Sequence, residues 1–181
     1  TVTIENQVAE VYIDQTFYNP NDWEVEGTYM FPIPADAAIS DFGMWVDGEK
    51  LTGEILDADE ASAIYNDYVI QMVDPALLEY SGRGMYKASI YPIPANSEKR
   101  VELSYVQALP LEGGYLHFWY PLSTEKYSSE PLDSISVQVS IETNEDIKTV
   151  YSPTHATSVQ LLSDREASAS YEATNVLPDR D

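Results

Sequence analysis

The most regular feature of the sequence is an alternation of apolar and polar residues with a period of two. In residues 8–18 the apolar side chains of Ala9, Val11, Ile13 and Phe17 alternate with mostly polar ones. This alternation is typical of a β-strand with one face packed and the other in water. The same pattern runs through 23–31, 38–46, 101–109 and 135–141, and Trp23 is expected on the packed face of its run. Shorter strand candidates are 76–80, 85–91, 115–120, 147–151, 156–162 and 167–174.

Residues typical of tight turns separate these runs. They are Asn19-Pro20-Asn21-Asp22, Asp47-Gly48, Ser81-Gly82-Arg83-Gly84 and Gly113-Gly114. Turns of this kind join neighbouring antiparallel strands. The sequence therefore predicts a mainly β protein with an antiparallel, sandwich-like architecture.

One segment has helical periodicity instead. From Asp57 to about residue 72, apolar side chains including Ile64, Tyr65 and Tyr68 follow the spacing of an amphipathic helix. Asp57 and Glu60 form a capping box at its start, and Pro75 follows its end. We expect one helix over about 57–72, docked on the sandwich through its aromatic stripe.

Two short segments resemble each other sixty residues apart. Both contain the letters Pro-Ile-Pro-Ala, at 32–35 and at 92–95. Proline has no backbone N–H to donate to a sheet, so each segment is expected to end a strand at a similar corner.

The charge of the chain excludes one class of function. With 9 basic and 31 acidic residues, the 181-residue chain carries a net charge of −22. Such a field repels phosphate backbones, so we expect no nucleic-acid binding. It also suggests an acidic, halophilic surface, for which stability would rise with salt. No apolar run is long enough for a membrane span, and without cysteine there is no disulfide, thiolate metal site or cysteine nucleophile.

The sequence offers little catalytic chemistry. The two histidines, His117 in a strand candidate and His155 after a turn, have no partner motif. A zinc helix, a phosphate-binding glycine loop and a nucleophile elbow are absent, and the acids from Asp57 lack the glycine and final glutamate of an EF-hand. We therefore predict a non-enzyme with no catalytic, cofactor-binding or metal-ligating residues and no cofactor, apart from weak adventitious calcium on clustered carboxylates.

Several motifs, in order along the chain, resemble the VIT domain, the vault and inter-α-trypsin module. They lie at 6–11, at 14–17 with Asn19, at 27–34 followed by Ala37 and Ala38, at 53–55 leading into 60–61 and 64–65, at 91–94 with 101–105, and at 152–155. The positions typical of the family are Phe31, Pro32, Pro34, Tyr65 and Pro92.

The resemblance implies a VIT domain over 1–174 and a linker over 175–181 that leads to an absent C-terminal von Willebrand A domain. It implies a non-catalytic interaction or scaffolding module of a secreted or cell-surface, adhesin-like protein. Its partners would be that A domain and an extracellular protein or matrix ligand. The acidic charge and the lack of an N-glycosylation sequon favour a prokaryotic source. Two alternatives stay open. One is a hydrolase with an unrecognised carboxylate site, although Glu24 and Glu26 are explained by a solvated strand face. The other is an intracellular, ribonucleoprotein-associated VIT domain.

Overall fold

The computed structural model describes residues 1–46, 49–56, 77–80, 85–123 and 130–181, and this part of the chain is mainly β, as predicted. The expected helix over about 57–72 lies outside the described residues. The strands are β1 (Val2–Glu5), β2 (Val8–Asn19), β3 (Val25–Pro32), β4 (Ala37–Val46), β5 (Glu49–Thr52), β6 (Glu54–Leu56), β7 (Leu77–Tyr80), β8 (Met85–Ile93), β9 (Ser97–Ala108), β10 (Leu111–Glu112), β11 (Tyr115–Leu116), β12 (Leu132–Glu142), β13 (Ser158–Leu161) and β14 (Glu166–Val176).

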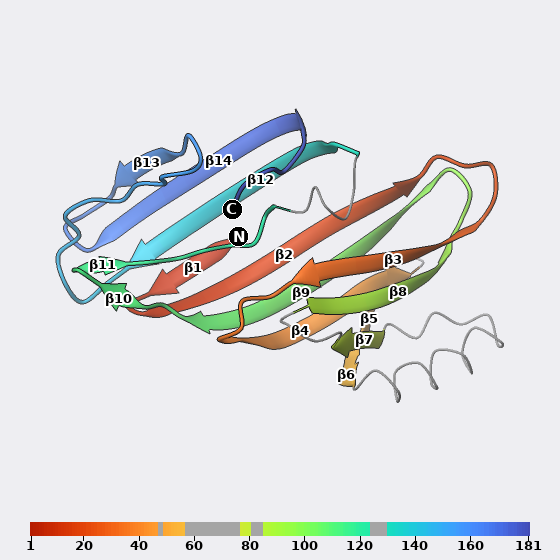
Figure 1. The fold of residues 1–181 in the computed structure, drawn as a ribbon, viewed down its shortest axis with the longest axis horizontal. Helices are drawn as coiled ribbons and strands as arrows, with labels where there is room; N and C mark the ends of the chain where they lie inside the picture. Colours follow the sequence, from red (N-terminus) through yellow and green to blue (C-terminus); the bar gives the residue numbers. More distant parts are fainter. Residues whose placement is uncertain (47–48, 57–76, 81–84, 124–129) are drawn as a thin grey trace. The chain divides into compact units, whose positions relative to one another are not determined.

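The chain divides into two compact units, and strands β2, β4 and β9, which are labelled in Figure 1, contribute residues to both. Unit 1 comprises Thr1–Tyr12, Asp36–Ala38 and Val106–Asp181, and unit 2 comprises Ile13–Ala35 and Ile39–Tyr105. The two units thus share strands, and each unit is described in turn below.

Unit 1 contains a sheet in the order β13-β14-β12-β1-β2. Strand β12 pairs with β14 in antiparallel register, whereas β1 pairs with β12 in parallel. A parallel pair needs a long connection between its strands, which the chain provides because strands β2 to β11 lie between β1 and β12 in the sequence. Along β12 the apolar residues Ile135, Val137, Val139 and Ile141 are half-buried and alternate with exposed polar side chains, which is the pattern expected of a sheet with one wet face.

The β10–β11 hairpin of unit 1 confirms the turn predicted at Gly113-Gly114. Both glycines have positive φ, 58° and 86°. A two-residue hairpin turn with positive φ at both positions matches the twist of the flanking strands, and glycine adopts it without strain.

Unit 2 contains two sheets, in the orders β2-β9-β4-β5 and β3-β8-β7-β6. Aromatic contacts join them: the rings of Phe31 on β3 and Phe42 on β4 lie 6.5 Å apart, and those of Phe17 on β2 and Tyr29 on β3 lie 5.2 Å apart. The fully buried side chains, which include Phe42, Met44, Leu103 and Tyr105, come from β4, β8 and β9. Unit 2 is therefore a sandwich whose core lies between its sheets. Strands β6 and β7 form its parallel pair.

The proline corners were predicted correctly. Strand β3 ends at Pro32 and β8 ends at Ile93, and the isoleucine between the prolines is buried in each corner. Ile33 follows the end of β3, whereas Ile93 is the last residue of β8 and still pairs with Val25, and each buried isoleucine anchors its corner in the core.

Several local predictions were wrong. Residues 147–151 form no strand, the run at 115–120 pairs only over Tyr115–Leu116, and the periodicity did not indicate β1, β5, β6 or β10. Trp23 lies before β3 and is 64% exposed rather than packed. The burial of β3 alternates without interruption from Val25 to Phe31, and the register shift near Val25 places its extra residue on β8. Trp23 is exposed because it lies in the loop before the strand, where it no longer shares the packed face.

The C-terminal segment follows directly from the last strand. Strand β14 runs to Val176, Pro178 is buried, and the backbone N–H of Ser123 donates to Asp181 Oδ1 over 2.6 Å. No helix within the described ranges is both long and apolar enough to cross a membrane.

Candidate functional site

Two loops of unit 2 meet at one end of its strands and form what we call the asparagine corner, residues 19–24 and 93–97. The first loop connects β2 to β3 and the second connects β8 to β9 (Figure 1). Asn96 links the loops, because its N–H donates to the Asn21 carbonyl over 3.1 Å and its Nδ2 to Asp22 Oδ1 over 3.2 Å. Asn96 has φ of 52°, a conformation that asparagine tolerates better than most residues.

Asn19 is the buried centre of this corner. Its Nδ2 donates to the carbonyls of Trp23 at 2.9 Å and of Ile93 and Pro94 at 3.0 Å each. Its Oδ1 accepts from the N–H of Asn21 at 3.0 Å and from Asn21 Nδ2 at 2.9 Å. Buried amide groups are costly unless they are hydrogen-bonded, so one satisfied side chain locks both loops in place.

The asparagine corner presents two large aromatic side chains to solvent. Trp23 is 64% exposed and Tyr18, next to Asn19, is 57% exposed. Asp22 and Glu24, on either side of Trp23 in the sequence, are also exposed. The loop that carries Trp23 is anchored through Asn19, so its aromatic and acidic groups stand on a fixed backbone, which is a common setting for binding residues.

A second cluster, the charged face, consists of Asp14, Asp41, Trp45, Lys50, Arg100 and Glu102. These residues come from β2, β4, β5 and β9, which are neighbours in one sheet of unit 2. Along β9 they alternate with the buried Val101 and Leu103, so the charged face lies on the side of the sheet away from the core.

Glu102 joins the two cations of the charged face. Its carboxylate oxygens lie 2.8 Å from Arg100 Nη2 and 2.9 Å from Lys50 Nζ, and its Oε1 also accepts from Trp45 Nε1 at 2.9 Å. The Glu102 side chain is only 7% exposed, so its charge depends on these partners. Asp14 completes the set with a bidentate pair to Arg100, with both distances 2.8 Å.

The aromatic member of the charged face is also bound to a cation. The guanidinium carbon of Arg100 lies 4.8 Å from the centre of the Trp45 ring, within the range of a cation–π interaction. Hydrogen bonds from Lys50 to Asp41 and then to Glu102 raise the pKa of the Lys50 amine above its ordinary value. Carboxylates and ring together therefore fix two cations within the domain.

Gly43 makes room for the Lys50 side chain. A Cβ on Gly43 would lie 2.6 Å from Lys50 Cε and 2.9 Å from the backbone oxygen of Leu51. Gly43 stands between Asp41 and Trp45 on β4, so the lysine stem crosses the strand where no side chain blocks it.

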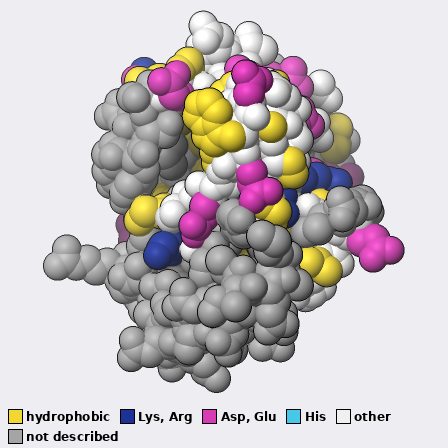
Figure 2. All heavy atoms as spheres, turned by 90° about the vertical axis from the view of Figure 1, so that its right-hand side faces the viewer, with side chains coloured by type: hydrophobic (Ala, Val, Ile, Leu, Met, Phe, Trp, Pro, Cys, Tyr) yellow, Lys and Arg dark blue, Asp and Glu magenta, His cyan; other side chains and the backbone are white. Residues whose placement is uncertain are grey.

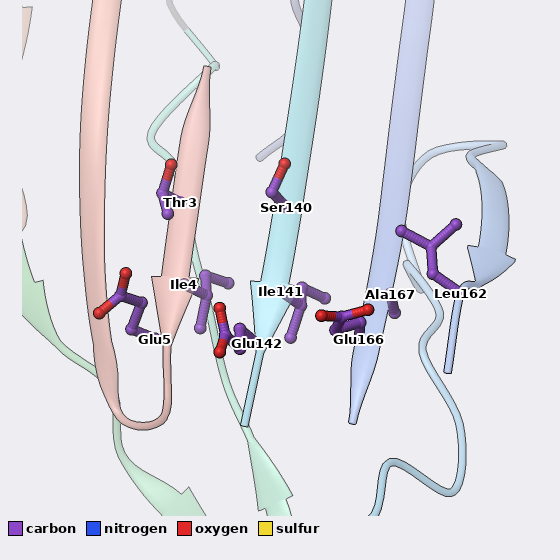
Figure 3. Close-up of a pocket in the computed structure, with 9 residues that line it drawn as sticks. All are labelled: Thr3, Ile4, Glu5, Ser140, Ile141, Glu142, Leu162, Glu166 and Ala167. Carbon is purple, nitrogen blue, oxygen red and sulfur yellow. The ribbon is translucent and has the colours of Figure 1, made fainter. Parts of the chain in front are cut away.

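Unit 1 contains a row of like charges at the edge of a surface hollow. Glu5, Glu142 and Glu166 line this hollow, and strand register places Glu5 opposite Glu142 and Glu142 opposite Glu166 (Figure 3). Like charges in directly opposed positions of a sheet destabilise it. Within the described ranges, no group of three or more His, Asp or Glu side chains is arranged to hold a metal ion.

The histidines and the candidate carboxylates do not come together. His117 is exposed beyond the end of β11, with its ring 6.5 Å from that of Tyr115. His155 lies in a turn, where its N–H donates to Ser152 Oγ over 3.1 Å and its ring packs edge-on to Tyr171 at 4.7 Å. Glu24 and Glu26 are exposed at the start of β3, as a solvated face predicts.

Sequence reasoning missed both polar clusters. The predicted site contained no residues, whereas the structure joins Asn19 to the second proline corner and Asp14 to Arg100 across 86 positions. The signals available were Asn19 within the motif at 14–19 and the polar pair Arg100 and Glu102 inside an apolar strand.

The structure defines a mainly β protein in which the two polar clusters join neighbouring strands and loops. Its family follows from the sequence comparisons. The chain belongs to the VIT family, because the model for the vault protein inter-alpha-trypsin domain matches residues 1–105. It is similar to von Willebrand factor A domain-containing protein 5A of mouse, with 32% identity over 67% of this chain and 16% of that protein. It is also similar to the rat protein of that name, with 28% identity over 96% of the chain and 24% of that protein.

A third relative is the mouse protein mono-ADP-ribosyltransferase PARP4, with 24% identity over 75% of this chain and 7% of that protein. The chain thus spans less than a quarter of the length of each of these relatives. The activity in the name of PARP4 belongs to that whole protein. The asparagine corner and the charged face both lie within the matched residues 1–105.

Proposed function

We propose that this VIT domain is a non-catalytic protein-interaction module of a von Willebrand A-type protein. The observation that carries the proposal is the exposure of large aromatic side chains on ordered backbone, with Trp23 as the clearest case. Tyrosine and tryptophan are enriched where proteins bind one another. In the space-filling view, hydrophobic side chains lie among Asp and Glu on the visible surface (Figure 2).

The family supports the partner in this proposal. Relatives that match the chain are named for a von Willebrand A domain, and we propose that such a domain, encoded after Asp181, is one partner and an extracellular protein or matrix component another. The cell-surface or secreted setting, the prokaryotic source and the halophilic character belong to the same proposal, and the net charge of −22 supports the last of these. The absence of cofactors, with at most weak calcium binding, is likewise proposed.

Site-specific photo-crosslinking in the full-length protein tests the module's role. A photoreactive phenylalanine analogue replaces, one at a time, exposed aromatic residues of both units, namely Tyr18, Trp23, Tyr115 and Tyr151. We expect at least one position to form a discrete adduct with one protein segment, and the same adduct from purified components. An absence of adducts at every position, in cells that produce the folded protein, would contradict an interaction role.

A further inference from the structure

The charged face shows how this domain binds a guanidinium. Arg100 lies over the Trp45 ring and is paired with Asp14 and Glu102. The binding set is thus one indole and two carboxylates. Of the cations that the structure describes, only that of Arg100 is placed over an indole.

The asparagine corner carries the same chemical groups. Trp23 supplies an indole, and Asp22 and Glu24 supply two carboxylates next to it in the chain, all of them exposed. The loop's backbone is fixed by Asn19, so the chain that carries these groups is ordered before any ligand arrives. Preordered groups bind without the entropic cost of immobilising a loop.

The chain supplies no basic residue from within the corner. The sequence has no Lys or Arg before Lys50, and none in residues 93–97. The nearest cations along the second loop are Lys99, whose side chain is buried, and Arg100, which is held by Asp14 and Glu102. The local charge at Asp22 and Glu24 is therefore complementary to a cation from another molecule.

We propose that the asparagine corner is a docking site for an arginine-bearing segment of a partner protein, with the guanidinium on Trp23 and beside Asp22 and Glu24. Arginine fits better than lysine, because its planar head stacks on a ring while it pairs with carboxylates. This inference rests on the proposed interaction function and names where and with what chemistry it operates.

The test uses the three indole N–H resonances of the domain, one for each of Trp23, Trp45 and Trp119. Variants W23A and W119A assign the signals by deletion. The probe is the peptide acetyl-Gly-Arg-Gly-amide, and the control is the same peptide with citrulline, which has nearly the same shape without the charge. Trp119 is the matched control residue because it is 50% exposed and lies in unit 1.

We expect the arginine peptide to shift the Trp23 signal saturably at moderate salt, while the Trp119 signal moves far less. The arginine peptide should bind about two- to fivefold more tightly than the citrulline peptide, as an exposed cation–π contact provides. The double variant D22N/E24Q should weaken binding of the arginine peptide several-fold, and its unchanged melting temperature would show that the fold is intact.

Equal shifts at Trp23 and Trp119, equal affinities for the two peptides, or unchanged affinity in D22N/E24Q would each overturn the proposal. Such a result would not contradict the proposed interaction function, because an adduct at Tyr115 or Tyr151 would still show that the module binds a partner through another surface. Conversely, an absence of crosslinked partners would contradict the proposed function, whether or not the arginine peptide binds at Trp23.

Discussion

Trp45 and Trp23 stand in the same structural unit and have similar acidic neighbours, yet they differ in what neutralises those acids. Trp45 lies in a sheet, where neighbouring strands bring Arg100, Glu102 and Lys50 against it. Trp23 lies beyond the strand ends, where only loops meet, and the cation is missing from both loops. The acids of the charged face are paired with Lys50 and Arg100, and we call this a closed site. The two loops of the asparagine corner contain no Lys or Arg, and we call this an open site.

The difference shows how one chemistry serves two purposes. Inside a sheet, strand register fixes the distance between opposite charges, so their attraction contributes to stability. At a corner, a buried amide provides the rigidity and leaves the aromatic ring and carboxylates for another molecule. A stability assay and a binding assay should therefore respond to different residues.

The largest effect is expected from removing the amide that makes the corner rigid. N19A leaves the carbonyls of Trp23, Ile93 and Pro94 without their donor in a buried site. We expect a loss of about 2–4 kcal/mol in the free energy of unfolding, measured by urea denaturation. N144A, at an exposed asparagine, is the control and should stay within about 0.5 kcal/mol. A loss as small as the control's would mean that the corner does not depend on Asn19.

Replacement by alanine should destabilise the protein much more at Trp45 than at Trp23. W45A removes the ring beneath Arg100 and the donor to Glu102, and should cost about 1.5–3 kcal/mol. W23A removes an exposed ring and should change the unfolding free energy by less than about 0.5 kcal/mol. Similar losses for both variants would break the distinction between a closed and an open site.

A smaller effect is expected where the Lys50 stem crosses β4. G43A places a methyl group against Lys50 Cε and the Leu51 carbonyl, and should cost about 1–3 kcal/mol. The double variant G43A/K50A should recover part of this loss, because the lysine clash disappears while the carbonyl contact remains. Strict additivity in the double-mutant cycle would show that the cost of G43A does not come from a clash with the Lys50 side chain.

The smallest effect concerns the titration of Lys50. Hydrogen bonds to Asp41 and Glu102 raise its pKa in the folded state above the ordinary 10.5. Its stabilising contribution is therefore fully present below pH 10.5 and is lost as the pH rises through the folded pKa. The difference in melting temperature between the wild type and K50M should be constant from about pH 7 to 9.5 and shrink at higher pH.

Two controls accompany this titration. Burial raises the pKa of Tyr120 to about 12, so the fold loses stability above pH 10, but this loss is common to both proteins and cancels in their difference. K148M replaces a side chain that is 83% exposed and is the control for the loss of a surface lysine. A wild-type to K50M difference that stays constant up to pH 12 would show that the lysine's charge does not matter.

Much of the fold could be predicted because its signals are local. The alternation at 8–18, 101–109 and 135–141 predicted β2, β9 and β12, and the Gly113-Gly114 turn predicted a hairpin. Each signal depends on a face buried along a continuous stretch of chain. The motifs around Phe31, Pro92 and Ser152 led to the VIT family, which the family model confirms.

Other features could not be predicted from the periodicity of the sequence. Strand β5 is exposed at all four positions and so shows no alternation, and β1 is too short to show one clearly. Trp23 was expected inside because it extends the alternation of β3, but the strand begins only at Val25 and Trp23 lies in the loop before it. The start of β3 is set by its pairing with β8, which a reading of 23–31 alone does not contain.

By itself, the sequence determined the β class, the two proline corners, the acidic charge and the family, since each depends on residue types and their spacing. Only the tertiary structure decided which polar residues have partners. Asn19 meets Ile93 and Arg100 meets Asp14 across 74 and 86 positions. Hydrogen bonds and ion pairs depend on distances of about 3 Å, and over such separations those distances are fixed by strand order and register rather than by neighbours in the chain.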